Sequence, residues 1–271
     1  MKNAKHKFKI NNVSEFEALY YFQDAPISTT AQVFPPHLHD AIEAYVLLSG
    51  DVSFAVESSV YKLKPGDIVI TKPNEMHNCV VNTTSFHKHM CFWFYPTNEF
   101  LFSDFLSHDF GKNNVISPDE KAKKRLSVIY DDIKTATESK NDLKRFYLFL
   151  EMIDIFKTFA NKNDTPITLP QNLKLILDDI DLNFKTLSSL DYFTEKYFLS
   201  QSTLNRLFKK YLHTTPKLYV ETKRLAHARQ LLKEGNSVLT ASSEAGFTDY
   251  SNFIRLFKKR FNITPKRYKD D

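Results

Sequence analysis

A 49-residue internal repeat in the last third of the chain constrains the fold more than any other feature of the sequence. Arg206-Leu-Phe-Lys-Lys210 returns as Arg255-Leu-Phe-Lys-Lys259, and ten of the 18 positions from Ser202 to Tyr219 are identical at that offset. Self-similarity at a fixed spacing indicates one supersecondary unit that is built twice. The last third is therefore predicted to contain two copies of one small fold.

The first copy ends a pattern of two helices. A short helix is predicted over Leu187–Lys196 and is followed by a turn. Ser200 is a favourable N-cap for a second helix over Gln201–Tyr211, because its hydroxyl can accept a hydrogen bond from a backbone N–H of the first turn. A short helix, a tight turn and a capped second helix are typical of a helix-turn-helix unit, here residues 187–211.

The second copy predicts the same arrangement over residues 238–261. Its short helix is Val238–Ala245, Gly246 supplies the turn, and Thr248 or Asp249 caps a helix that runs to about Phe261. In helix-turn-helix proteins the second helix enters the major groove of DNA. The repeat therefore predicts two DNA-reading helices.

Each second helix has one apolar and one polar face. The apolar residues recur at i, i+3 and i+4 and are expected to be buried: Leu204, Leu207 and Phe208, then Phe253, Leu256 and Phe257. Arg and Asn can contact base edges, whereas Lys and Ser more often contact phosphates. The predicted DNA-binding residues are Gln201, Ser202, Asn205, Arg206 and Lys209 in the first copy and Tyr250, Ser251, Asn252, Arg255 and Lys258 in the second.

Charge supports this interpretation. The formal net charge is +5, but residues from Pro166 onward carry +7 and the preceding 165 residues carry −2. A basic segment on a nearly neutral body indicates a polyanionic partner for that segment alone. Double-stranded DNA is the predicted partner of the last third.

Three stretches of this third resemble the DNA-binding region of AraC/XylS-type transcription regulators. They are Arg224-Leu-Ala-His-Ala-Arg-Gln-Leu-Leu232, Gly246-Phe-Thr-Asp-Tyr-Ser251 and Phe257-Lys-Lys-Arg-Phe-Asn-Ile-Thr-Pro265. The resemblance covers about the last 100 residues. It implies that one linker helix, about Pro216–Lys233, joins two units that enter successive major grooves.

The same resemblance carries expectations about function. It places the base-reading positions on Ser202, Asn205, Arg206, Tyr250, Ser251, Asn252 and Arg255. It implies a transcription regulator that acts as an activator, has RNA polymerase among its partners and responds to a small effector such as a carbohydrate. His213 and Asn262 follow the second helices at positions where the family usually has glycine, and Asn tolerates a left-handed backbone better than His does.

The first 118 residues are predicted to form an antiparallel, cupin-like β-barrel. Short segments rich in Val, Ile, Phe and Tyr alternate with turn signals such as Ser49-Gly50-Asp51 and Pro65-Gly66. Many short strands without a helical period between them are typical of a small barrel or sandwich. The strands expected are Glu43–Leu48, Val52–Val56, Asp67–Thr71 and Phe86–Tyr95.

Residues 119–161 have a helical period and predict two helices that break near Ser139-Lys140-Asn141. The second is strongly aromatic on one face, which indicates packing on the barrel or on another subunit. The stripe of Phe146, Phe149, Ile153 and Phe156 predicts a homodimer through these helices. Residues 162–170 are expected to be a linker, and residues 171–271 the all-helical DNA-binding domain. The predicted fold is therefore α+β with two domains.

A histidine-rich segment opens the predicted barrel. His37-Leu-His39-Asp-Ala-Ile-Glu43, followed by Gly50, matches the first cupin motif, while Pro73-Asn-Glu-Met-His77 matches the second only at its Pro and His. In cupin enzymes the corresponding residues, here His37, His39, Glu43 and His77, ligate a divalent metal, a set that suits Fe, Mn, Ni or Zn.

Three interpretations of these residues stay open: contact with a small molecule without a metal, metal binding, and structural histidines. We favour the first and predict no cofactor. Because alternate strand residues share a face, Tyr45 lies with Glu43, and Trp93 alternates with His87 and His89 on a strand that faces the interior or the solvent. The predicted ligand-binding residues are His37, His39, Glu43, Tyr45, His77 and Trp93.

Two function classes follow. The favoured one is a ligand-responsive transcription regulator without enzymatic activity, and the alternative is a cupin metalloenzyme, a dioxygenase or isomerase, with an appended helical domain. Five glycines and no GxGxxG or GxxxxGK[ST] motif exclude the common nucleotide-binding enzymes. Neither a signal peptide nor a membrane-length apolar run is present, and only two cysteines occur, so a soluble cytoplasmic protein without a membrane partner is expected.

Overall fold

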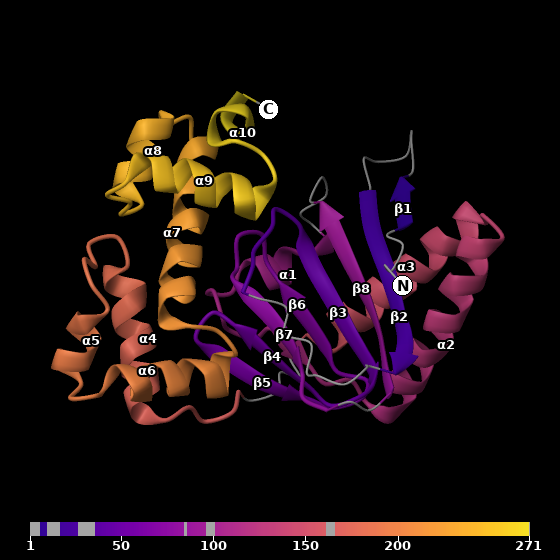
Figure 1. The fold of residues 1–271 in the computed structure, drawn as a ribbon. Helices are drawn as coiled ribbons and strands as arrows, with labels where there is room; N and C mark the ends of the chain where they lie inside the picture. Colours follow the sequence, from indigo (N-terminus) through magenta and orange to yellow (C-terminus); the bar gives the residue numbers. More distant parts are fainter. Residues whose placement is uncertain are drawn as a thin grey trace. The chain divides into compact units, whose positions relative to one another are not determined.

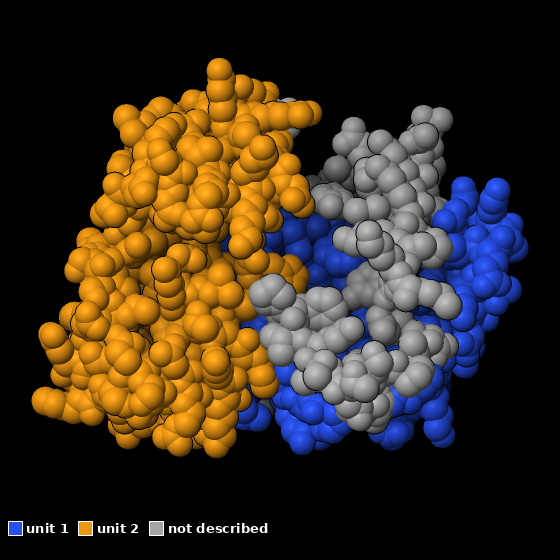
Figure 2. Space-filling model, in the orientation of Figure 1, with its two compact units in different colours: residues 1–34, 38–167 blue, residues 35–37, 168–271 orange. Residues whose placement is uncertain are grey.

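The chain forms two compact units in a computed structural model that describes residues 6–9, 17–26, 36–83, 86–95, 101–160 and 166–270. One unit comprises residues 1–34 and 38–167, and the other comprises residues 35–37 and 168–271 (Figure 2). The first contains the strands and three helices, and the second contains helices only over the described residues (Figure 1). This confirms the predicted α+β class.

The strands of the N-terminal unit form two antiparallel sheets. The larger sheet has the order β1-β2-β8-β3-β6-β9 and the smaller has the order β5-β4-β7. The larger sheet consists of β1 (His6–Lys9), β2 (Glu17–Pro26), β3 (Ile42–Ser49), β6 (Ile68–Thr71), β8 (Phe86–Tyr95) and β9 (Val115–Ile116). The smaller consists of β4 (Val52–Val56), β5 (Ser59–Leu63) and β7 (His77–Val81). The four predicted strands are present, each within one residue of its expected ends.

Strand β3 lies inside the larger sheet and separates two layers of packing. It pairs with β8 on one side and with β6 on the other. Tyr45 and Leu47 point toward the smaller sheet and pack with Phe54 and Tyr61. Because side chains alternate along a strand, the residues between them point the other way, toward the helices.

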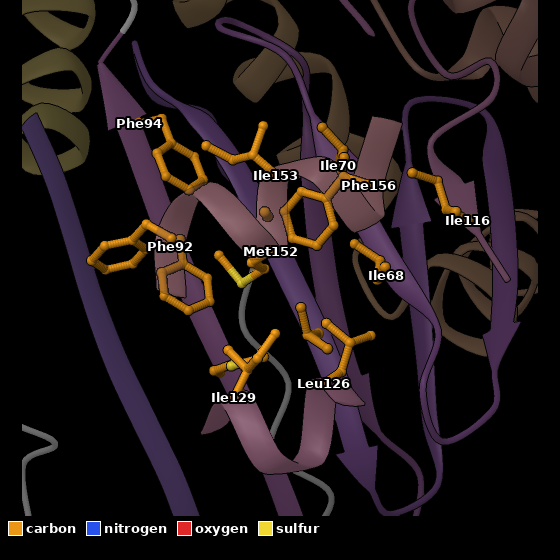
Figure 3. Packing of buried hydrophobic residues seen from close by; sticks show 14 of the residues in the cluster. Ile68, Ile70, Phe92, Phe94, Ile116, Leu126, Ile129, Met152, Ile153 and Phe156 are labelled. Carbon is orange, nitrogen blue, oxygen red and sulfur yellow. The ribbon is translucent and has the colours of Figure 1, made fainter. Parts of the chain in front are cut away.

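Two helices cover the outer face of the larger sheet (Figures 1 and 3). Helix α2 (Glu120–Glu138) begins at Asp119, whose side chain accepts a hydrogen bond from the Ala122 N–H, and α3 (Asp142–Thr158) begins at Asn141 in the same manner. The predicted break between them is therefore confirmed. A one-turn helix, α1 (Ser103–Leu106), precedes them.

The aromatic stripe of α3 packs within its own unit. Phe149, Ile153 and Phe156 are at most 2% exposed and lie against the sheet residues Phe92 and Phe94 (Figure 3). Phe146 is partly buried against the same cluster. Of the two surfaces expected for this stripe, the barrel and another subunit, the structure shows the first, because the outer face of the larger sheet is itself aromatic. A dimer must use other residues of these helices.

The C-terminal unit is helical over its described residues. It begins with α4 (Gln171–Asn183), and part of the predicted linker, residues 162–165, lies outside the described residues. The remaining helices are α5 (Asp191–Lys196), α6 (Gln201–Leu207), α7 (Pro216–Lys233), α8 (Val238–Glu244), α9 (Tyr250–Phe261) and α10 (Pro265–Asp270). Within the described ranges, no helix is long and apolar enough to cross a membrane.

Both copies of the repeat have the predicted helix-turn-helix order, with two differences in the first copy. Helix α5 begins at Asp191 rather than at Leu187, and the Asp191 N–H donates a hydrogen bond to the Ser189 hydroxyl just before it. The second helix, α6, changes to a π-helical turn over Phe208–Leu212. His213 and Asn262, which follow the two second helices, both adopt the left-handed backbone that the sequence suggested.

Helix α7, which matches the predicted linker helix, is held to the turn after α4. Arg224 on α7 donates hydrogen bonds to the carbonyl oxygens of Phe184 and Leu187, at 2.8 and 2.5 Å. The second copy approaches the same turn, since a Cβ placed on Gly246 would lie 2.2 Å from the Lys185 carbonyl oxygen. This turn therefore contacts both the linker helix and the second copy of the repeat.

We expect Gly246→Ala to destabilise the C-terminal unit by roughly 2 kcal/mol or more, because the new methyl group meets backbone and the residue has φ of +89°. Gly235→Ala is the matched control, since Gly235 also has φ of +89° but no atom lies within 4 Å of its added Cβ. Urea denaturation measures both variants. If both variants lost the same free energy of unfolding, the positive φ alone, and not the contact with Lys185, would account for the destabilisation of Gly246→Ala.

Candidate DNA-binding face and effector site

The second helix of each copy, α6 and α9, exposes the residues that the sequence assigned to DNA. Of the six apolar residues expected to be buried, Leu204, Phe208, Phe253 and Phe257 are fully buried, whereas Leu207 and Leu256 are half-buried. Eight of the predicted DNA-binding residues are exposed and two, Asn205 and Asn252, are half-buried: the exposed ones are Gln201, Ser202, Arg206, Lys209, Tyr250, Ser251, Arg255 and Lys258. Figure 1 shows α6 and α9 near opposite ends of α7.

Hydrogen bonds orient part of this surface. Ser200 caps α6 by accepting from the Thr203 N–H, and Asp249 caps α9 by accepting from the Asn252 N–H. The Arg255 guanidinium donates to the Asn252 side-chain oxygen at 2.6 Å. Asn252 therefore positions Arg255, whereas Asn205, which lies one turn before Lys209, donates to the Gln201 carbonyl of its own helix.

The second copy has a complete apolar core behind α9. Helix α7 contributes Leu225 and Leu232, and α8 contributes Ala241, which is fully buried, while Ser242 beside it is 2% exposed. Phe247 and Tyr268 pack around the rings of Phe253 and Phe257: together these form one cluster. Small residues on α8 allow α9 to approach closely, so the recognition helix of the second copy rests on a packed support.

In the N-terminal unit, a carboxylate and two imidazoles meet between the two sheets. Glu43 lies on β3, and His77 is the first residue of β7 in the smaller sheet. One ligand atom of each of His39, Glu43 and His77 lies within 4.8 Å of the others. His37 belongs to the short segment 35–37 that is grouped with the C-terminal unit, so the site is built here on the other three.

The hydrogen bonds of the two imidazoles turn their Nε2 atoms toward the carboxylate. His39 Nδ1 donates to the Ala41 carbonyl at 3.0 Å, and His77 Nδ1 donates to the Glu75 carbonyl at 2.8 Å. The Nε2 atoms then lie 2.8 Å and 3.5 Å from Glu43 Oε2. Metal-binding histidines are commonly fixed in this way, with the other ring nitrogen bonded to a carbonyl. The donor set therefore fits a divalent ion as well as a polar ligand.

Trp93 completes this cluster. It is the cross-strand neighbour of Glu43 in the β3–β8 pair. Its indole N–H donates to Glu43 Oε2 at 2.6 Å and lies 3.1 Å from His39 Nε2. The His39 side chain is 23% exposed, whereas those of Glu43 and His77 are 7% and 1% exposed. The cluster is therefore reached from solvent on the His39 side.

Glu43 and His77 stabilise each other's charged form. Burial alone raises the pKa of Glu43, but the charge of His77 and the hydrogen bonds from His39 and His77 outweigh it and hold that pKa well below its usual range. Burial alone lowers the pKa of His77, but the adjacent Glu43 carboxylate reverses the effect and raises it. The cluster carries a buried ion pair.

A second polar group lies further along the same interior face. The Tyr45 hydroxyl lies 3.1 Å from His87 Nε2, which is 2.7 Å from His89 Nδ1. His87 and His89 are at most 3% exposed, so this strand face points inward. Burial lowers the pKa of His87 to about 4 and that of His89 well below its usual range, so both rings are neutral at pH 7.

Sequence reasoning missed the residue that supports His77. Glu75 is fully buried, and its carboxylate accepts hydrogen bonds from the N–H groups of Gly111 and Lys72 and from the Asn114 side chain, at 2.6 to 2.9 Å. Burial raises its pKa, although these bonds oppose the shift. Its carbonyl holds the His77 ring. Its place between Pro73 and His77 in the partial cupin motif was the available signal.

Two family comparisons match separate parts of the chain. A helix-turn-helix domain matches residues 193–271, and a cupin domain matches residues 28–95. The matches fall on the repeat and on the histidine-rich sheets, respectively. They define the chain as a DNA-binding transcription regulator with a cupin-like ligand-binding domain.

Whole-chain relatives agree with this class. The uncharacterized HTH-type transcriptional regulator YbfI of Bacillus subtilis (strain 168) is 24% identical over 224 residues, which is 80% of each chain. With the two domain matches, this relative agrees with the resemblance of the repeat motifs to AraC-type transcription regulators.

Solved structures of similar outline are also known. An apo ToxT structure from Vibrio cholerae is 15% identical with a TM-score of 0.39, covering 96% of this chain and 98% of that one. An AraC-type transcriptional regulator structure from Chromobacterium violaceum is 33% identical over 36% of this chain and 89% of that one, with a TM-score of 0.33.

Replacing Arg206 with Ala is expected to weaken binding to the specific DNA site by about 1–3 kcal/mol, if its guanidinium contacts a base in the manner of other recognition helices. The side chain is exposed on α6, so folding should be unaffected. Lys174→Ala, an exposed cation on α4, is the control for general charge loss. Fluorescence anisotropy on specific and unrelated duplexes measures both. Equal weakening on the two duplexes would assign Arg206 to phosphate instead.

Proposed function

We propose that the protein activates transcription from the cytoplasm in response to a small polar effector, a carbohydrate in the first instance, that binds between the two sheets of its N-terminal unit. The observation that carries this proposal is the cluster of Glu43, His39, His77 and Trp93, which is open to solvent on one side. Carbohydrate hydroxyls both donate and accept hydrogen bonds, and an aromatic side chain suits their apolar faces.

The neighbouring interior face supports a ligand of this kind. Tyr45, His87 and His89 offer uncharged donors and acceptors on the same face as Glu43. A buried carboxylate with neutral rings nearby favours a neutral, hydroxyl-rich ligand over an anion, because an anion would lie against Glu43. Recognition therefore needs no cofactor.

The same donors also favour a second candidate, a bound divalent metal. His39, His77 and Glu43 supply two nitrogens and one oxygen with their tautomers fixed by carbonyl groups. A metal there would coordinate the ligand's oxygens or, in the alternative enzyme, polarise them for reaction. Such an enzyme would leave the 49-residue repeat without a role, whereas a transcription regulator uses it to bind DNA. We therefore favour the regulator.

We further propose a homodimer through the outer face of α3. Leu143, Tyr147 and Leu150 recur at i, i+4 and i+7 and are 80%, 55% and 39% exposed. An apolar stripe of this length on a surface helix indicates a partner. In an antiparallel pair that crosses near residue 149, Lys144 would lie level with Asp154 of the second copy, and these opposite charges favour self-association.

Activation itself is proposed to proceed through contact with RNA polymerase when effector is bound. The effector signal would pass from the sheets to the DNA-binding unit by changing the population of DNA-bound states. A transcription assay with purified RNA polymerase, a selected operator and the effector tests this step. Transcription that falls on adding effector would show a repressor.

Thermal unfolding with a panel of sugars is expected to identify a stabilising effector, and His39→Ala should abolish that stabilisation while DNA binding stays intact. Binding at a hundred-fold excess over Kd stabilises by about 2.7 kcal/mol, a readily measured shift. His108→Ala is the control, because His108 contacts Lys72 through its backbone carbonyl. Elemental analysis is run in parallel. One equivalent of metal, lost in His39→Ala, would instead assign the cluster to an ion.

Tyr147→Lys is expected to convert the dimer to a monomer, because it places a desolvated charge at the centre of the proposed stripe. Light scattering over a range of concentrations measures the mass. Leu182→Lys, at a residue 82% exposed on α4, makes the same change in the other unit and should leave the mass unchanged. A wild-type monomer at high concentration, with and without DNA, would contradict the proposal.

A further inference from the structure

The two helix-turn-helix turns are built as the same hydrogen-bonded motif but with different residues at its left-handed position. In the second copy, the Gly246 N–H donates to the Ser243 carbonyl and the Phe247 N–H donates to the Ser242 carbonyl. In the first copy, the corresponding donors are the N–H groups of Phe198 and Leu199. This is the Schellman arrangement, whose left-handed residue is usually glycine.

Phe198 occupies the left-handed position in the first copy. Its φ is +51°, a conformation that is unfavourable for a bulky side chain because Cβ crowds the backbone. The ring is 95% exposed, so burial within the protein does not offset this cost. At Gly246 the equivalent position packs against the Lys185 carbonyl and leaves no room for a side chain. The first copy therefore presents an aromatic ring where the second copy can present none.

The place of Phe198 in the chain points to DNA. Ser200 caps α6, so Phe198 lies two residues before the N-cap and at most about 10 Å along the chain from Gln201. The N-terminal residues of a recognition helix contact base edges in the major groove. Left-handed backbone at a non-glycine residue is commonly retained where a functional contact requires it.

The surroundings of the ring favour DNA over an apolar protein surface. After the half-buried Leu199, the next three residues, Ser200, Gln201 and Ser202, are all exposed and polar. Protein–DNA interfaces are polar with single apolar contacts to thymine methyl groups or wedges against the stacked bases. Lys209, an exposed cation in the π-helical turn that continues α6, would contact the DNA backbone nearby.

We propose that Phe198 is a DNA-contacting residue that packs its ring on apolar carbon atoms at the edge of the major groove read by α6. Either a thymine methyl group or a deoxyribose could supply these atoms. The contact would be specific to the first copy, so the two halves of the operator would be recognised by different chemistry. Sequence reasoning treated Phe198 only as part of the turn.

Phe198→Asn tests the proposal, because Asn removes the ring but tolerates the left-handed backbone. The probe is a duplex selected from a random-sequence pool by the wild-type, full-length protein. We expect affinity for it to fall by about 10- to 100-fold, the range for losing one buried aromatic contact. The thermal midpoint should equal or exceed that of the wild type. Phe198→Leu, which keeps an apolar side chain, should recover part of the affinity.

Leu182→Asn is the matched control, since Leu182 is 82% exposed on α4 and precedes the helix-turn-helix units. Its affinity should stay within two-fold of the wild type. Deoxyuridine in place of each thymine then distinguishes the two sources. If deoxyuridine at one position lowers the DNA affinity of the wild type but not that of Phe198→Asn, the ring contacts the methyl group of the thymine at that position. If no thymine behaves in this way, and Phe198→Asn also binds unrelated duplexes more weakly than the wild type does, the ring contacts a deoxyribose.

Three results would overturn the proposal. The first is affinity within two-fold of the wild type for Phe198→Asn. The second is a clear fall in the thermal midpoint of both Phe198→Asn and Phe198→Gly, which would show that the ring serves the fold. The third is normal DNA affinity with lost activation in the transcription assay, which would assign Phe198 to RNA polymerase.

Discussion

The alternation of side chains along β3 is the constraint on which the N-terminal unit depends. Ala44 and Val46 face the helices, while Glu43 and Tyr45 face the smaller sheet. A shift of one residue in the pairing with β8 would exchange these faces, burying the carboxylate among aromatic rings and removing it from the histidines. The fold and the cluster proposed to bind the effector therefore rely on the same register, in which Glu43 pairs with Trp93.

In the C-terminal unit, the single helix α7 joins the two copies of the repeat. Its Arg224 satisfies carbonyl groups after α4, and its apolar face forms the core under α9. Ahead of it, Asp179 on α4 accepts hydrogen bonds from Lys196 and Tyr197 at the end of α5. These bonds outweigh the burial that would raise the pKa of Asp179 and lower that pKa instead. Polar contacts thus fix how the first copy is assembled.

Much of this architecture could be predicted because it is repeated or periodic. The repeat gave both helix-turn-helix units and the caps at Ser200 and Asp249, and helical spacing located α2, α3 and their break. The direction of the α3 stripe could not be predicted, because spacing shows that a face is apolar but not which surface covers it. The outer residues of the same helix, such as Tyr147, carry the exposed apolar surface instead.

The cluster around Glu43 was predictable in part for a similar reason. His39, Glu43 and His77 follow a recognisable motif, whereas Trp93 joins them only through strand pairing and Glu75 only through contacts distant in sequence. The left-handed turn at Phe198 also escaped prediction, because the residue type there opposes the conformation that the neighbouring bonds impose. At that residue, the turn requires a left-handed backbone that phenylalanine disfavours.

Helix α7 is one continuous helix of 18 residues and is anchored by Arg224. It therefore fixes the spacing between α6 and α9. One base pair added between two half-sites would rotate one relative to the other by about 35° around the duplex. A continuous helix without a hinge could not adjust the orientation of α6 relative to α9 to follow such a rotation. Binding sites for this protein would then diverge within their half-sites while the distance between the half-sites stays constant.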